Sequence, residues 1–248
     1  MRPWLRLTTL NDLNKASEEK DLRTESGRPV RFIPPDKKDA YYEVRVFETG
    51  HVETRPESLH DWFNALAWLA FPRTKARLNA LHAAEIPREG GRRGRLRDML
   101  TIFDEGGAIV LCQDLELVSL LKDFSWKALF WERRQRVQAS MRILVIGHAV
   151  LEQAVDLRPG ITCKAVFVSQ GDPDGAAADL LQHIPSPREL APLPVFGYPG
   201  WLAQDEDFYN DIRYFRPGPR GRMHPGVGQA AAVHNTEESP GSTERDAG

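Results

Sequence analysis

Residues 57–85 carry the side chains with the greatest potential for chemistry, within a segment that is otherwise apolar. His60 and Asn64 are four residues apart, a spacing that puts them on one face of a helix, and Asp61 lies beside them around the axis. The sequence SLHDWFNALAWLAF is apolar nearly all round, which predicts a helix buried on most sides. Polar groups in such surroundings must be hydrogen-bonded or metal-bound, because an unpaired one costs about 2–7 kcal/mol.

A second polar set follows Pro72, which ends the first helix because proline disfavours helical geometry in the residue before it. Thr74 is predicted to cap the next helix, KARLNALHAAE. Its polar residues at i, i+4 and i+7 share one face, and the turn lets that face meet the polar face of the first helix. The candidate catalytic residues are therefore His60, Asp61, Asn64, Lys75, Asn79 and His82.

The segment GHAVLE adds His148 and Glu152, four residues apart on a predicted helix whose other face is apolar. A histidine and a carboxylate at this spacing can bind one metal ion, or the carboxylate can orient the imidazole. An ordinary pair on a helix surface is the alternative. With the first two sets, the chain has enough nitrogen and oxygen ligands for a mononuclear or dinuclear site of a divalent metal. The candidate ligands are His60, Asp61, His82, His148 and Glu152.

These polar residues also have a structural explanation. Asp61 can support the start of its helix, while His60 and Asn64 satisfy buried backbone groups. Lys75 would then be an exposed residue of a first turn, and His82 a partly buried histidine. Perturbed polar groups gather both at functional sites and in structural networks, so spacing alone leaves both explanations open.

The elements expected around these residues define a helix-rich α+β fold in a single domain with short β-hairpins. Alternation in residues 41–55 and the Thr49-Gly50 break predict one hairpin. A second is expected from LTIF and AIVLC, with Asp104-Glu105 at its tip. Residues 115–138 are predicted to be a long helical region. Residues 141–156 start apolar and continue as a helix, and residues 161–170 are a predicted strand.

Composition narrows the classes of protein. The 33 basic and 35 acidic residues nearly balance, so no overall charge marks a nucleic-acid or membrane binder. Two cysteines suggest neither a disulfide framework nor a cysteine-based zinc site. The N-terminus lacks the apolar core of a signal peptide, and the longest apolar run is too short to span a membrane, so we expect a cytoplasmic protein. Residues 1–216 are expected to form the domain, and residues 217–248, which have no aromatic residue or apolar periodicity, a disordered tail.

The common motifs for nucleotide binding, serine hydrolases and zinc proteases are missing from the sequence. However, several unusual segments occur in an order that resembles the bacterial family of domain of unknown function 3025, over about residues 4–217. These segments are YEVRVFETGHVETR, HDWFNALAWLAFPRTKARLNALH, RDMLTIFDEGG, GHAVLE, GYPGW and FRP. The resemblance implies a bacterial, single-domain protein in which residues 60–82 belong to the family pattern. It supplies no catalytic residues.

Three functions remain open. The first is a metal-dependent hydrolase acting on a small anionic substrate such as a phosphoester, with Lys75 and Asn79 holding the anion. The alternative is a non-enzymatic interaction or scaffold domain, in which the polar helix pair is a structural network and Trp201, Tyr209 and Tyr214 form an aromatic docking surface. A nucleic-acid binder using the arginines of residues 88–97, or Arg133, Arg134 and Arg136, is the least favoured because charge runs are usually solvated faces.

Overall fold

The computed structural model describes residues 9–36, 41–90, 92–156, 160–202 and 204–218. The described residues form one compact unit. Nearly all of the predicted tail, residues 217–248, therefore lies outside the described residues. Within the described ranges, no helix is long and apolar enough to cross a membrane.

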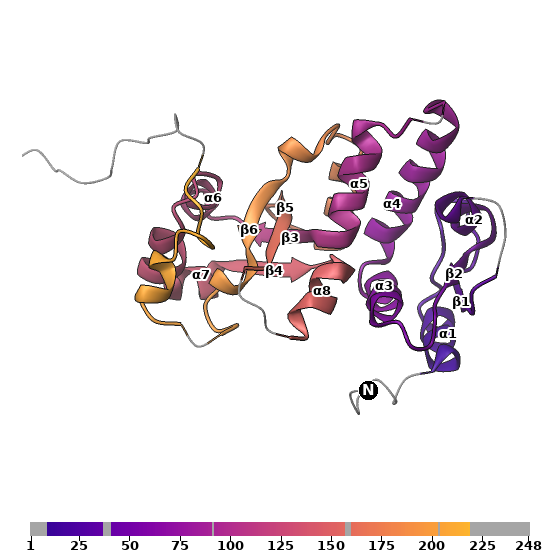
Figure 1. Ribbon diagram of the computed structural model, residues 1–248, viewed down its shortest axis with the longest axis horizontal. Coiled ribbons are helices and arrows are strands. Elements are labelled where there is room, and N and C mark those ends of the chain that lie inside the picture. The colour runs from indigo at the N-terminus through magenta and orange to yellow at the C-terminus, as the bar shows by residue number, and fades with distance from the viewer. Residues whose placement is uncertain (1–8, 37–40, 91, 157–159, 203, 219–248) are drawn as a thin grey trace, which may run out of the picture. The chain divides into compact units, whose positions relative to one another are not determined.

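Helices predominate over strands along this unit (Figure 1). The α-helices are α1 (Leu10–Glu19), α2 (Tyr42–Thr49), α3 (Leu59–Ala70), α4 (Pro72–Glu85), α5 (Arg95–Gly106), α6 (Leu115–Lys122), α7 (Arg134–Ser140), α8 (His148–Ala154) and α9 (Pro173–Leu181). A π-helical turn, η3 (Ala128–Glu132), precedes α7, and short 3₁₀ turns lie at η2 (Ile86–Arg88), η4 (Pro187–Glu189), η5 (Val195–Gly197) and η6 (Asp207–Asn210). The strands are β1 (Arg31–Ile33), β2 (His51–Glu53), β3 (Gly107–Cys112), β4 (Met141–Val145), β5 (Thr162–Val168) and β6 (Ala191–Pro194). The helix-rich α+β class is confirmed.

A four-stranded sheet of order β4-β3-β5-β6 is the centre of the unit. Strand β3 pairs antiparallel with β4 and parallel with β5, and β6 pairs antiparallel with β5. Because side chains of a strand alternate between faces, Ala108 and Val110 of β3 pack into one hydrophobic core and Ile109 into another. The near-continuous apolar run GAIVLC follows from burial on both faces.

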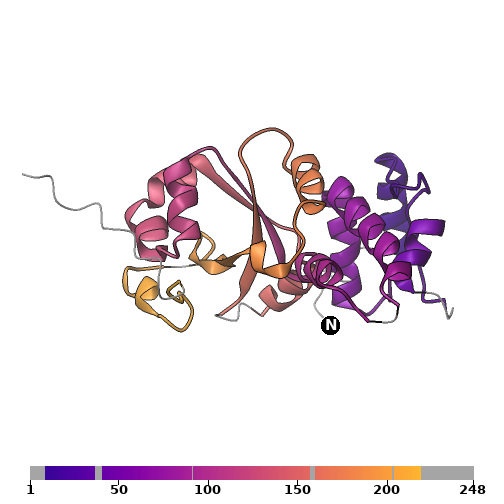
Figure 2. The same cartoon turned by 90° about the horizontal axis from the view of Figure 1, so that it is seen from above.

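The predicted site residues lie on α3, α4 and α8, which pack together with α5. Helix α4 packs against α2, α5 and α9, and α8 packs against both α3 and α5. Both cartoon views show α8 beside α3 and next to the end of α5 (Figures 1 and 2). A third hydrophobic core joins the outer face of α3 to α1, β1 and β2.

The start of α4 is fixed by a carboxylate from a distant part of the chain. Asp174, in the first turn of α9, accepts hydrogen bonds from the backbone N–H groups of Arg73 and Thr74 at 2.8 and 2.9 Å. These are among the N–H groups that a helix leaves without internal partners. The prediction that Thr74 caps the helix is therefore wrong: Phe71 occupies the cap position, and Thr74 lies inside the helix.

The predicted hairpin over residues 41–55 is also wrong. Residues Tyr42–Thr49 form α2, and only His51–Glu53 is a strand, parallel to β1. Gly50 was interpreted as a hairpin turn, but it ends the helix at φ 77°, where glycine is favoured. A Cβ atom there would lie 2.1 Å from the carbonyl oxygen of Pro29.

The second predicted hairpin fails for a similar reason. The segment LTIF belongs to α5. The buried residues of α5 include Met99, Leu100 and Phe103, which have the spacing of a helix rather than of a strand. Asp104 and Glu105 therefore lie in the last turn of α5 instead of at a hairpin tip. The helical region expected over residues 115–138 is divided into separate helices, with Phe124 at φ 59° between them.

A close backbone contact brings the end of α5 to the start of α8. A Cβ atom at Gly147 would lie 2.5 Å from Cα of Gly106 and 2.7 Å from the carbonyl oxygen of Glu105. Only glycine fits this position without a shift of backbone. The contact places Glu105 next to His148, the first residue of α8.

We expect Gly147→Ala to lower the free energy of unfolding by about 1–3 kcal/mol, because the added methyl group forces the two backbones apart. Urea denaturation of the full chain measures this change. Gly106→Ala is the matched control, since its Cβ atom would lie 3.7 Å from Val150, an ordinary contact distance. Equal stability of the two variants would contradict the proposed packing constraint.

Candidate metal site and its cavity

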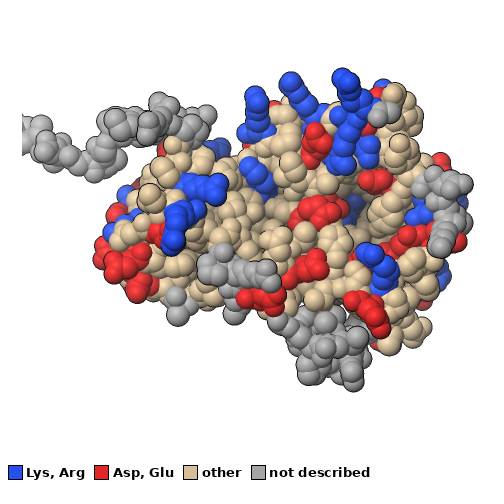
Figure 3. All heavy atoms as spheres, viewed as in Figure 1, with Lys and Arg blue, Asp and Glu red and all other residues tan. Residues whose placement is uncertain are grey.

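A cavity of about 460 Å³ is lined by α2, α3, α4, α5 and α8. All six candidate catalytic residues, His60, Asp61, Asn64, Lys75, Asn79 and His82, lie on its wall. Acidic side chains border a hollow on the face seen in Figure 3, and basic side chains project along the edge above α4 and α5. The two polar helix faces thus reach a common space, and residues 104, 105 and 148 join them there.

Lys75 is buried, contrary to the alternative that placed it in an exposed first turn, with 3% of its surface accessible. Its ammonium donates a 2.7 Å hydrogen bond to Oδ1 of Asn64 and forms an ion pair with Asp104. One charged group therefore joins α3, α4 and α5. Burial raises the pKa of Asp104, but Lys75 and His148 outweigh this effect and hold the pKa below its ordinary value.

The other two polar residues of α4 contact α2 and α5. Asn79 donates a 2.7 Å hydrogen bond to the backbone carbonyl of Glu43, while its Oδ1 atom is buried without a partner among the described residues. His82 accepts a 3.4 Å hydrogen bond from Arg97 through Nδ1. Burial lowers the pKa of His82. Both side chains line the cavity.

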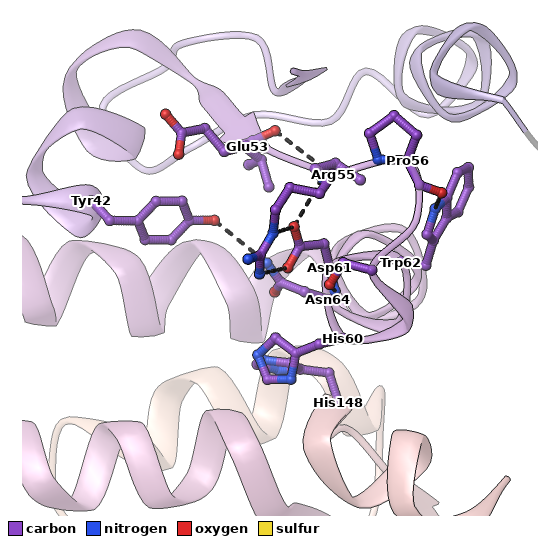
Figure 4. Close-up of polar contacts among 12 residues, drawn as sticks. Tyr42, Glu53, Arg55, Pro56, His60, Asp61, Trp62, Asn64 and His148 are labelled. Carbon is purple, nitrogen blue, oxygen red and sulfur yellow. Dashed lines mark hydrogen bonds and ion pairs between the residues drawn. The ribbon is translucent and has the colours of Figure 1, made fainter. Parts of the chain in front are cut away.

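His60 and His148 meet with Glu105 at one end of the cavity (Figure 4 shows the two rings). Their Nε2 atoms are 3.1 Å apart, and Oε2 of Glu105 lies 3.4 Å from that of His148 and 3.8 Å from that of His60. A circle through these three atoms has a radius of about 2.0 Å, which matches the 2.0–2.2 Å bonds of zinc to nitrogen and oxygen. The geometry fits one metal ion.

The outer nitrogen atoms of the two rings have different surroundings. Nδ1 of His60 lies 3.2 Å from Oε2 of Glu152, so this carboxylate can fix the ring with its Nε2 lone pair toward the cluster. Nδ1 of His148 is buried and has no hydrogen-bond partner of normal geometry among the described residues, although the backbone of Asp104 is close enough to raise its pKa. Burial has the larger effect and lowers the pKa of His148 to about 4, which leaves a neutral imidazole at pH 7.

Asp61, His82 and Glu152, three of the predicted metal ligands, lie outside this cluster, and Glu152 contacts Nδ1 of His60 instead. The carboxylate of Asp61 accepts hydrogen bonds from Nε and Nη2 of Arg55 instead (Figure 4). Glu105 and Arg55 also line the cavity, although neither is among the site residues predicted from the sequence. The sequence pattern predicts a hairpin tip at Glu105 and the end of a strand at Arg55, whereas Glu105 lies in the last turn of α5.

Residues proposed for other functions have mostly structural contacts. Tyr209 and Tyr214 are buried, and their hydroxyl groups donate to the carbonyls of Gly197 and Ile161, whereas Trp201 is 38% exposed. In the basic run, Arg93 pairs with Asp98 and Arg97 with Glu89. In the second basic group, Arg133 and Arg136 both form ion pairs with Glu116.

Two histidines and one glutamate around a cavity are the ligand set of a class of mononuclear metal sites that keep coordination positions open. The chain carries this set on a helix-rich α+β domain. Residues 30–219 match the family described as protein of unknown function (DUF3025), and the chain belongs to that family. No curated protein and no solved structure matches the chain.

The buried ion pair gives a first test. We expect Lys75→Met to lower the free energy of unfolding by about 3 kcal/mol, because Asp104 would keep a charge without its partner. The double variant Lys75→Met/Asp104→Leu should recover part of the loss in urea denaturation. Lys15→Met, at a side chain that is 73% exposed, serves as the control. If the Lys75→Met protein is as stable as this control, the ion pair of Lys75 and Asp104 does not stabilise the fold.

Proposed function

We propose that the protein is a metal-dependent hydrolase with one divalent cation bound by His60, His148 and Glu105. The observation that carries the proposal is the mutual distance of the three ligand atoms, all within 4.8 Å of one another. Helices α3, α5 and α8 each supply one ligand, so the set is held by packed elements rather than by flexible loops.

The charges of the site support a divalent ion. Asp61 is paired with Arg55, and Asp104 with Lys75. In the described part of the chain, Glu105 and Glu152 have only histidine partners in ion pairs. Two carboxylates beside two histidines carry two negative charges when the imidazoles are neutral, and one divalent cation balances them.

A metal ion held by His60, His148 and Glu105 would lower the pKa of a bound water and polarise the bond under attack. The residues of the chain provide the remaining functions. Asp104, which is adjacent to Glu105 and lines the cavity, stays charged because its pKa is lowered, so its carboxylate can orient a water by accepting a hydrogen bond. Lys75 uses two of its three N–H groups on Asn64 and Asp104, and the third can stabilise negative charge that develops on the substrate.

The proposal includes the bacterial cytoplasm as location and a small anionic molecule as substrate, as expected from the sequence. Both cysteines, Cys112 and Cys163, are free and buried, in keeping with a reducing compartment. The main alternative is a structural hydrogen-bond chain from Glu152 through His60 to His148. Such a chain requires no metal ion, so metal binding separates the two explanations.

We expect purified protein dialysed against zinc, manganese or iron(II) salts to retain about one ion per chain in plasma mass spectrometry. His60→Ala, His148→Ala and Glu105→Gln should each lose it, because three ligands are needed to hold the ion. Glu152→Gln should keep the ion with roughly 10–100-fold weaker affinity, since it only orients His60. His183→Ala, at an exposed histidine, is the control. Unchanged metal content in all of these variants, or no metal in the wild type, would rule out the site.

A further inference from the structure

Arg55 lies on the cavity wall in a fixed orientation. Its Nε and Nη2 atoms donate hydrogen bonds of 2.7 and 2.9 Å to the two carboxylate oxygens of Asp61, and its backbone N–H donates one of 2.8 Å to Oδ2. Asp61 itself is 8% exposed and belongs to the first turn of α3. A guanidinium held along one edge in this way has lost most of its rotational freedom.

The other edge of this guanidinium has no hydrogen bond or ion pair with the described residues. An arginine side chain has five N–H donors, and Asp61 takes two of them. The side chain of Arg55 is 63% exposed, whereas that of Lys75, the other lysine or arginine on the described cavity wall, is 4% exposed and is paired with Asp104. Arg55 is therefore the more accessible of the two cations on this wall.

Stability alone gives a weak reason for this arrangement. An ion pair with one exposed partner adds little to stability, and Asp61 could support the start of α3 without fixing an arginine. A planar guanidinium with free N–H groups matches the geometry of carboxylate and phosphate oxygens, which it binds in a bidentate manner. Glu53, a nearby acidic residue of the wall, is paired with Arg45 at 2.7 Å, which reduces its repulsion of an anion.

We propose that Arg55, held by Asp61, binds the anionic group, a carboxylate or a phosphate, of the substrate. The inference rests on the proposed hydrolase in one respect: the molecule that Arg55 binds is the one whose scissile bond lies at His60, His148 and Glu105. Asp61 is then a positioning residue, which explains why it lines the cavity without joining the metal ligands.

The Nε–H signal of Arg55 in a ¹⁵N-correlated NMR spectrum reports directly on this site, and Arg55→Lys identifies it. The full chain is titrated with inorganic phosphate and, separately, with succinate, in metal-free and metal-loaded form, against sodium chloride at equal ionic strength. We expect a saturable shift with a millimolar dissociation constant in both forms. If only phosphate saturates the signal, Arg55 binds a phosphate group of the substrate; if only succinate does, it binds a carboxylate. Saturation by both anions shows that Arg55 accepts either group.

Variants connect the signal to the arrangement. Isothermal titration with the same anions should show binding lost in Arg55→Lys, weakened at least about tenfold in Asp61→Asn, and unchanged in Arg77→Lys, an arginine outside this cavity. No saturable shift of the Arg55 signal, or binding that survives Arg55→Lys, would overturn the proposal. The metal-free form is measured as well, so the two hypotheses can fail separately. Anion binding without metal binding would contradict only the metal site, and metal binding without a shift of the Arg55 signal would contradict only the anion site.

Discussion

A charged ammonium group buried between helices must be surrounded by oxygen atoms, because an unpaired buried charge is too costly to persist. Lys75 meets this requirement with the amide of Asn64 and the carboxylate of Asp104, which come from α3 and α5. The relative positions of α3, α4 and α5 are therefore fixed at one point. The remaining polar side chains of the cavity wall are arranged around that point.

The position of the three proposed metal ligands follows from this constraint. Because Asp104 is held by Lys75, the next residue, Glu105, is fixed in the last turn of α5. The close approach of Gly147 then puts His148 beside Glu105, and the packing of α3 against α8 adds His60. The three ligands come from distant segments of the chain, yet each lies at the first or last turn of a helix whose position is determined by packing.

The sequence was informative where the helical period was strong. The two helices of residues 57–85 and their polar faces were predicted, and so was the spacing of His148 and Glu152, because buried polar residues at intervals of three and four stand out in apolar segments. Glu105 was missed because Gly106-Gly107 resembles a hairpin turn, whereas these glycines end α5 and begin β3. The pairing of Arg55 with Asp61 is a tertiary contact that spacing does not reveal.

The central claim is the binding of one metal ion by ligands from α3, α5 and α8. Anomalous diffraction from crystals of the full chain loaded with zinc or cobalt(II) tests it directly. The account predicts a single strong anomalous peak about 2.0–2.2 Å from Nε2 of His60, Nε2 of His148 and a carboxylate oxygen of Glu105. A peak at other residues, such as Asp61 and His82, or a fully loaded crystal without a peak at the three ligands, would contradict it.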